Sequence, residues 1–203
     1  MLTVALPKGR ISTQALGLFS TAFGKEFAFN DRELILDSQP LRFLLVRNQD
    51  VPTYVGHGAA DLGVVGLDVL EERGEAGALR LLDLQIGRCK VVLGSRIGAP
   101  LNYLSPCIRV ATKMVNITHR FFSQRALAVD IIKLYGSIEL APLVGLADGI
   151  VDIVETGTTM KQNNLQIEEV LLESSAYLIA NTNSFFVSKR AVLDLQDRLF
   201  RLI

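Results

Sequence analysis

The 203-residue sequence contains no tryptophan, two cysteines, two histidines and six prolines. Cys89 and Cys107 form no CxxC motif and have no metal-ligand spacing to His57 or His119. Nothing in this pattern predicts a zinc site or a disulfide framework. We expect both cysteines to be reduced and mostly buried. We expect both histidines to be structural, because neither has a partner arranged for acid–base work.

The sequence has no excess of either charge, with 21 Lys and Arg against 21 Asp and Glu. A broad basic surface for nucleic acid or anionic membranes is therefore not expected. No apolar run approaches the length of a membrane span, and residues 1–10 lack the order of charge and apolar run that marks a secretory signal. With 49% hydrophobic residues, the composition is that of an ordinary globular protein, and the length allows one domain or two small ones. The unpatterned cysteines favour a cytoplasmic protein.

Strand-like and helix-like segments alternate along the chain. This alternation is typical of an α/β fold with largely parallel sheets. The expected strands include 2–6, 34–36, 41–46, 62–65, 79–86, 89–94, 108–111, 130–133, 150–154 and 176–180, and the expected helices include 11–23, 51–57, 68–73, 117–126 and 188–203.

Residues 54–65 and 143–154 share one layout: a helix, a Gly/Ala junction, an Asp and a buried strand. This echo favours two similar α/β lobes, with chance similarity as the alternative. We expect lobe I to comprise 1–88 plus 185–203 and lobe II to comprise 89–184. Two crossings of the chain predict a hinge and a ligand cleft between the lobes.

The segment 150–159 reads as a buried strand that ends in two acids and a Thr-rich turn. Asp152 and Glu155 suit hydrogen bonds from sugar hydroxyls. The small residues of the turn, Thr156-Gly157-Thr158-Thr159, leave backbone N–H groups and hydroxyls available to a phosphate. From this local pattern an ordinary Gly/Thr turn is an equal alternative.

Several cations stand where strands begin or end. Lys8-Gly9-Arg10 follows the first strand and opens the first helix, where anions are favoured. Arg32 precedes an apolar run and Arg47 follows one, and an Arg there suits bidentate contact with phosphate. Lys113 ends another strand, and Glu139 lies at an expected helix start. Each of these residues alone is as consistent with a solvated surface charge.

Five motifs occur in one order: LPKGR, VPTYVxxGAADLGVVGxDVL, ATK, KLYGSxELAPLVGLAD and DIVETGTT. Together they resemble the short-form catalytic subunit of the ATP phosphoribosyltransferase family, over nearly the whole chain. The resemblance implies a bilobal, type II periplasmic-binding-protein-like fold without a C-terminal regulatory domain. It also implies magnesium-dependent attack by adenine N1 of ATP on C1 of phosphoribosyl pyrophosphate (PRPP). The products would be phosphoribosyl-ATP and pyrophosphate, in the first step of histidine biosynthesis.

The resemblance further implies roles for individual residues. Arg10 and Arg32 are expected to be catalytic, because cations there would stabilise the charge that develops as the C1–O bond breaks. Mg²⁺ is expected to arrive with the substrate phosphates rather than in an all-protein site. PRPP would be held by Glu139, Asp152, Glu155, Thr156, Gly157, Thr158 and Thr159, while ATP or pyrophosphate would face Lys8, Gly9, Arg10, Arg32, Arg47 and Lys113.

Short forms of this family associate with a regulatory subunit resembling histidyl-tRNA synthetase, so we expect a hetero-oligomer and a catalytic-subunit dimer. One alternative is a non-catalytic bilobal solute-binding or ligand-sensing module on the same fold. A receptor for a neutral solute has no need of Lys8, Arg10 and the Thr-rich turn together. A second alternative is a non-catalytic paralogue that serves only as a subunit. Against it, no expected phosphate-site position carries a disabling residue.

Overall fold

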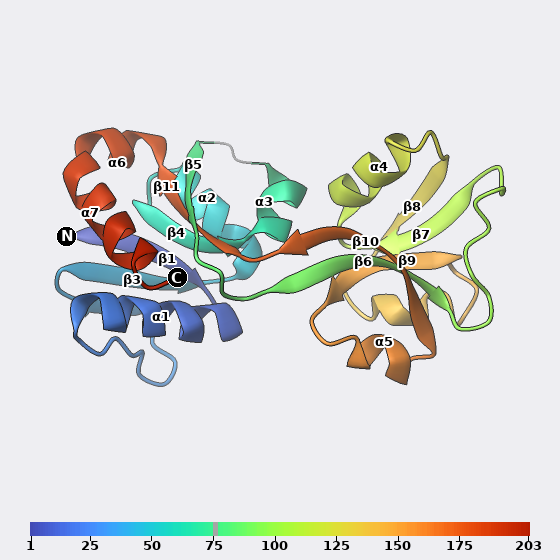
Figure 1. The fold of residues 1–203 in the computed structure, drawn as a ribbon, viewed down its shortest axis with the longest axis horizontal. Coiled ribbons are helices and arrows are strands. Elements are labelled where there is room, and N and C mark those ends of the chain that lie inside the picture. Colours follow the sequence, from blue (N-terminus) through green and yellow to red (C-terminus); the bar gives the residue numbers. More distant parts are fainter. Residues whose placement is uncertain (75–76) are drawn as a thin grey trace. The chain divides into compact units, whose positions relative to one another are not determined.

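The computed structural model describes residues 1–74 and 77–203 of the chain. These residues form two compact α/β units (Figure 1). Unit 1 contains residues 1–88 and 175–203, and unit 2 contains residues 89–174. The chain therefore passes from unit 1 to unit 2 and returns. No helix among the described residues combines the length and apolarity needed to cross a membrane.

Unit 1 is built on a six-stranded sheet of order β2-β3-β1-β4-β11-β5. The central strand β1 pairs in parallel with β3 and β4, whereas β2, β11 and β5 join by antiparallel pairing. The bounds are β1 Leu2–Pro7, β2 Ile35–Ser38, β3 Leu41–Val46, β4 Leu62–Gly66, β5 Ala78–Asp83 and β11 Ala176–Asn181.

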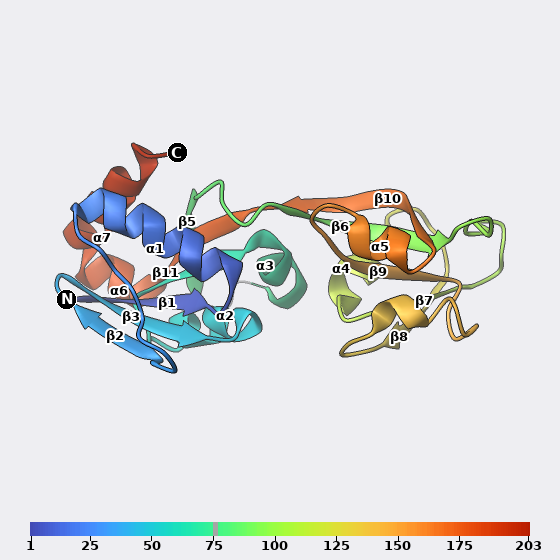
Figure 2. The same ribbon diagram turned by 90° about the horizontal axis from the view of Figure 1, so that it is seen from below.

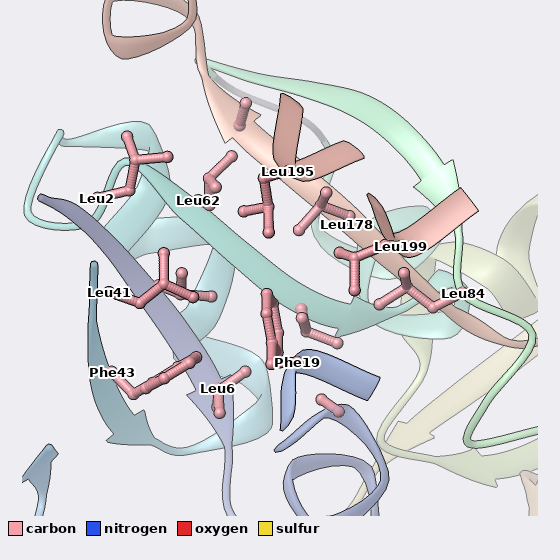
Figure 3. Packing of buried hydrophobic residues seen from close by; sticks show 14 of the residues in the cluster. Leu2, Leu6, Phe19, Leu41, Phe43, Leu62, Leu84, Leu178, Leu195 and Leu199 are labelled. Carbon is pink, nitrogen blue, oxygen red and sulfur yellow. The ribbon is translucent and has the colours of Figure 1, made fainter. Parts of the chain in front are cut away.

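Helices cover both faces of this sheet, and α1 and α2 lie on opposite sides of it (Figure 2). Helix α1 turns Ala15 and Phe19 inward, four residues apart, as an amphipathic helix does. Phe19 packs with Leu195 and Leu199 of α7 in one apolar cluster (Figure 3). The helices are α1 Arg10–Phe23, η1 Asn48–Asp50, α2 Val51–Gly56, α3 Leu67–Arg73, α6 Thr182–Val187 and α7 Lys189–Phe200.

Unit 2 is built on a five-stranded sheet of order β10-β6-β9-β7-β8. Strand β7 pairs in parallel with β8 and β9, and β6 pairs antiparallel with β9 and β10. The strands are β6 Cys89–Arg96, β7 Ile108–Thr112, β8 Val129–Lys133, β9 Gly149–Val154 and β10 Leu165–Ser174, and the helices are α4 Val115–Ser123, η2 Ile138–Leu140 and α5 Thr158–Gln162.

The expectation of two similar α/β lobes is confirmed by the strand orders. The order β8-β7-β9-β6-β10 in unit 2 repeats β3-β1-β4-β11-β5 in unit 1, with the same pattern of parallel and antiparallel pairs. The expectation of largely parallel sheets is wrong, because both sheets are mixed. In each sheet, the strand that directly follows a crossing of the chain pairs antiparallel with both of its neighbours. This strand is β6 in unit 2 and β11 in unit 1. The ligand cleft expected between the lobes stays a prediction.

The second crossing lies between Ser174 and Ser175, not after residue 184 as expected. The segment 176–180 is strand β11 of unit 1, where it pairs with β4 and β5 and buries Ala176 and Leu178 completely. Its apolar character therefore comes from a core position rather than from a crossing. Both cysteines were expected to be mostly buried, but Cys89 is half-buried and Cys107 is exposed, and neither forms a disulfide within the described part of the chain.

Candidate functional site

The acidic strand and Thr-rich turn lie at the carboxyl end of β9. Asp152 is half-buried on the strand, and Glu155 follows its last residue. Because β7 runs parallel to β9, the residue after β7 stands at the same edge of the sheet, and this residue is Lys113. Lys113 Nζ lies 3.4 Å from Asp152 Oδ1. Lys113 therefore belongs with the acids of unit 2.

The Asp152 side chain is oriented by its own backbone as well as by Lys113. Its Oδ1 accepts a hydrogen bond from the Ile153 N–H at 2.8 Å. Asp152 exposes 26% of its side chain, and Lys113 exposes 35%. Both groups are held in place while part of each remains accessible to a ligand.

The turn after β9 presents hydroxyls and backbone donors together. Gly157 has φ 79°, a left-handed conformation that strongly favours glycine, and α5 begins directly after it. The Oγ1 atoms of Thr156 and Thr158 lie 3.0 Å apart. Thr158 and Thr159 occupy the first turn of α5, where N–H groups lack intrahelical partners. The turn thus gathers groups of the kind that a phosphate accepts from.

Met160 of α5 anchors the turn in the core of unit 2, where its side chain is 5% exposed. Met160 packs in an apolar cluster with Val92, Ile150 and Val154. A Cβ placed on Gly94 of β6 would stand only 2.2 Å from Met160 Cε. A side chain at Gly94 would therefore require the end of the Met160 side chain to move. Sequence reasoning missed this pair, because the contact joins residues that are far apart in the chain.

Glu139 lies in η2, which begins after Ser137 in a left-handed conformation of φ 49°. Its neighbour Ile138 is buried in the same apolar cluster as Met160. Glu139 itself is half-buried. The structure places it on a separate element from the acids of β9.

The cations predicted in unit 1 gather at one edge of its sheet. Lys8-Gly9-Arg10 follows β1, and Arg47 follows the parallel neighbour β3. The Lys8 N–H donates to the Val46 carbonyl at 2.9 Å, which fixes the two strand ends side by side. Strand β2 runs antiparallel to β3, so Arg32, three residues before β2, approaches the same edge. Five residues from three segments thus stand at one edge of the sheet, and their contact with ATP or pyrophosphate stays a prediction.

The conformations at this edge are unusual and specific. Gly9 has φ 103° and ψ −152°, a backbone conformation that residues other than glycine rarely adopt. Arg32 also has a positive φ, of 61°. Arg10 Nη2 donates to the Arg88 carbonyl at 3.3 Å. For Lys8, Arg32 and Arg47, no side-chain hydrogen bond or ion pair is found among the described residues, and all three are exposed.

Asn48, next to Arg47, is a residue that sequence reasoning did not single out. Its Oδ1 atom is buried and lacks a hydrogen-bond partner within residues 1–74 and 77–203. Buried polar atoms are usually satisfied, so this oxygen is an exception in the packing beside Arg47. No sequence signal could have found it, because the property depends on packing around η1.

Both units thus carry polar strand-end loops of the kind that bind anionic ligands, on repeated sheets of one topology. This repeat defines a fold of two α/β units of the periplasmic-binding-protein-like kind. The same fold occurs in the second Venus-flytrap domain of Bordetella pertussis BvgS (TM-score 0.61, 14% identity, 98% of this chain and 84% of that one). It also occurs in the GluR0 ligand-binding core of Nostoc punctiforme (TM-score 0.61, 15% identity, 100% of this chain and 92% of that one).

Sequence comparison is more specific. Residues 47–201 match the family model HisG, described as ATP phosphoribosyltransferase. The chain is 63% identical to an ATP phosphoribosyltransferase of Wolinella succinogenes, over 100% of this chain and 98% of that protein. It is 59% identical to that of Helicobacter hepaticus, over 98% of this chain and 97% of that protein. The chain belongs to the ATP phosphoribosyltransferase family.

A solved relative agrees in structure. A chain of the ATP phosphoribosyl transferase (HisG:HisZ) complex from Thermotoga maritima superposes with a TM-score of 0.85 and 33% identity. The match covers 99% of this chain and 98% of that one. The resemblance read from the five motifs is therefore confirmed over the whole sequence.

Proposed function

We propose that this chain transfers the phosphoribosyl group of PRPP to N1 of the adenine of ATP, with release of pyrophosphate. The bond from C1 of the ribose to the pyrophosphate oxygen breaks, and a bond from C1 to adenine N1 forms. The observation that carries the proposal is the turn after β9, where two acids and three threonines stand at one strand end. Family membership supports the same reaction.

Asp152 and Glu155 accept hydrogen bonds from the ribose hydroxyls of PRPP in this proposal, and Glu139 is a further ribose contact. Thr156, Gly157, Thr158 and Thr159 donate to the 5′-phosphate. The Lys113–Asp152 contact of 3.4 Å supports a second task for Lys113, which is to orient the Asp152 carboxylate. Lys113 then faces ATP or pyrophosphate with its remaining donors.

The cations of unit 1 bind the triphosphate of ATP or the leaving pyrophosphate. Adenine N1 is a weak nucleophile, so the transition state carries positive charge on the ribose and growing negative charge on the pyrophosphate. Positioned cations stabilise such a state more than proton transfer does. Arg10 and Arg32 have this catalytic role, and Lys8, Gly9 and Arg47 complete the phosphate contacts.

Mg²⁺ enters this reaction with the phosphates of its substrates. Among the described residues, no group of three or more His, Cys, Asp or Glu side chains is arranged to hold a metal ion. Asp152 and Glu155 fit a cation that takes most of its ligands from phosphate oxygens and water, as Mg²⁺ commonly does. When bound, the ion neutralises charge on the pyrophosphate.

A regulatory subunit of the HisZ type, which resembles histidyl-tRNA synthetase, is the proposed partner, in a hetero-oligomer built on a dimer of this chain. The Thermotoga maritima HisG:HisZ complex, which contains the similar chain, supports this assignment. The proposed location is the cytoplasm, because the reaction uses ATP as a substrate.

The proposal is tested by incubating the purified chain with ATP, PRPP and Mg²⁺, with and without a HisZ-type subunit, and following phosphoribosyl-ATP by mass spectrometry. We expect product that requires both substrates and appears in equal amount to pyrophosphate. Reactions without PRPP serve as the control. Absence of product both with and without the partner overturns the proposed activity.

A further inference from the structure

A cavity of about 360 Å³ lies in unit 2, away from the Asp152–Thr159 turn. It is lined by Arg109 near the start of β7, by Asp148 just before β9, and by Arg96 at the end of the antiparallel strand β6. All three positions belong to the edge of the sheet opposite the carboxyl end of β9. The six residues of β9 separate the two edges, a length of about 20 Å.

Two of the charges in this cavity neutralise each other. Arg109 Nη2 lies 2.8 Å from Asp148 Oδ1, and the Arg109 N–H donates to Asp148 Oδ2 at 2.8 Å. Arg109 Nη1 also donates to the Gly145 carbonyl. These hydrogen bonds lower the pKa of Asp148 and raise that of Arg109, so both groups are charged at neutral pH. The pair forms a fixed, neutral part of the wall.

Arg96 supplies the remaining charge. Its side chain is exposed, and no hydrogen bond or ion pair is found for its guanidinium within the described part of the chain. Glu168 lies behind the wall and does not line the cavity. Its carboxylate already accepts from the Ser95 hydroxyl, the Gln166 amide and the Leu101 backbone. The cavity therefore offers one available positive charge to a ligand.

The rest of the wall is part polar, with Asn102 and Ser105, and part apolar. Leu101, Ile108, Pro142 and Ala147 line the cavity, and Leu101, Ile108 and Ala147 are buried hydrophobic residues of unit 2. A volume of about 360 Å³ is at the small end of the range for ligand pockets, which is about 300–1,000 Å³. Such a site favours a compact ligand with an apolar body and a single acidic group.

We propose that this cavity binds a small organic anion, a carboxylate or a phosphate ester with an apolar body, whose acidic group pairs with Arg96. The apolar body of the ligand packs against Leu101 and Ile108. The fixed Arg109–Asp148 pair holds the strand starts in register beneath it. This site shares no residue with the proposed PRPP and ATP contacts, and the inference does not depend on the proposed reaction.

The test is titration of the whole ¹⁵N-labelled chain by NMR, with benzoate and phenyl phosphate as probes. Benzamide, which has the same apolar body without the charge, is the matched neutral control. We expect both anions to shift the amide signals of Leu101 and Gly145 in a saturable way, and benzamide to bind at least about tenfold more weakly. The tighter of the two anions identifies the acidic group that the site prefers.

Two variants test the assignment to Arg96. Arg96→Gln should weaken benzoate binding at least about tenfold, whereas Arg190→Gln, which removes an exposed arginine of α7, should leave it unchanged. Ala99→Phe, which places a large side chain in the cavity and keeps Arg96, should abolish binding of both anions. Equal binding of benzamide and benzoate, unchanged affinity in Arg96→Gln, or shifts confined to residues 8–10 and 156–159 would each overturn the proposal.

Discussion

Asp61 and Asp148 make the same contact in the two units. Asp61 Oδ2 accepts the Thr3 N–H at 2.8 Å, at the start of β1. Asp148 Oδ2 accepts the Arg109 N–H at 2.8 Å, at the start of β7. In both units the acid precedes a buried strand and clamps the neighbouring parallel strand. The echo seen in the sequence is therefore a structural repeat and not a chance similarity.

The Asp148 contact makes stability depend on pH. The hydrogen bond from Arg109 is the largest cause that holds the pKa of Asp148 below its ordinary value of 3.8. Because this folded-state pKa is depressed, the contact stabilises the fold above about pH 4 and is lost as the pH falls through the folded value. In Asp148→Asn, the urea midpoint should change less between about pH 5 and pH 2.5 than in the unsubstituted chain. Asp31→Asn, at an exposed position, is the control and should keep the full dependence.

Asp152 is predicted to contribute to the reaction with PRPP and to contribute little to the stability of the fold. Asp152→Asn keeps the size of the side chain and removes its charge, so we expect kcat/KM for PRPP to fall about 10²-fold. The thermal midpoint should change by less than about 2 °C, because the side chain is partly exposed. Asp130→Asn on the neighbouring strand β8 is the matched control. Equal losses in both variants would contradict a specific role for Asp152.

Arg32 is predicted to stabilise the transition state. Arg32→Ala should lower kcat about 10²–10³-fold, which corresponds to about 2.7–4 kcal/mol of barrier, while KM for ATP changes little. The reason is that negative charge grows on the pyrophosphate only as the C1–O bond breaks. Arg190→Ala is the control. A rise in KM for ATP with unchanged kcat would reassign Arg32 to ground-state binding.

Gly94 is predicted to set the depth of the Thr-rich turn. A Cβ at this position would stand 2.2 Å from Met160 Cε and 3.1 Å from the Gln166 carbonyl oxygen. Gly94→Ala should therefore cost about 1–3 kcal/mol of unfolding free energy and raise KM for PRPP. Gly17→Ala in α1 meets open space and should instead stabilise by about 0.5–1 kcal/mol.

A double-mutant cycle checks the cause of the Gly94 effect. In a Met160→Ala background the clash with Cε is absent, so Gly94→Ala should cost less than it does alone. The measurement is the urea denaturation midpoint of the unsubstituted chain, Gly94→Ala, Met160→Ala and the double variant. Equal costs in the two backgrounds would place the strain at the Gln166 backbone and remove the link to Met160.

The elements predicted well from sequence are those with a clear period or a continuous apolar run. Helix α1 carries apolar residues at helical spacing, and β4 and β9 are short buried runs flanked by Gly or Asp. Strand β10 was not predicted. Two register shifts, between Ile167 and Glu169 and between Val170 and Leu172, break the alternation of buried and exposed residues that marks a strand.

The sequence could nominate residues for the candidate site, but it could not predict the contacts among them. Strand-end position alone pointed to Lys113 and to Asp152. Their meeting at 3.4 Å depends on the parallel register of β7 and β9, in which Thr112 pairs with Val151. A pairing across 39 residues leaves no local signal. The buried Asn48 oxygen and the Gly94–Met160 fit are likewise properties of packing.

The most direct test of the central claim is a crystal structure of this chain with PRPP and Mg²⁺. The account predicts the 5′-phosphate within hydrogen-bond distance of the backbone N–H groups and hydroxyls of residues 156–159. It also predicts the ribose hydroxyls against the carboxylates of Asp152 and Glu155. A 5′-phosphate bound at Lys8 and Arg47, with residues 156–159 making no contact to PRPP, would contradict the account.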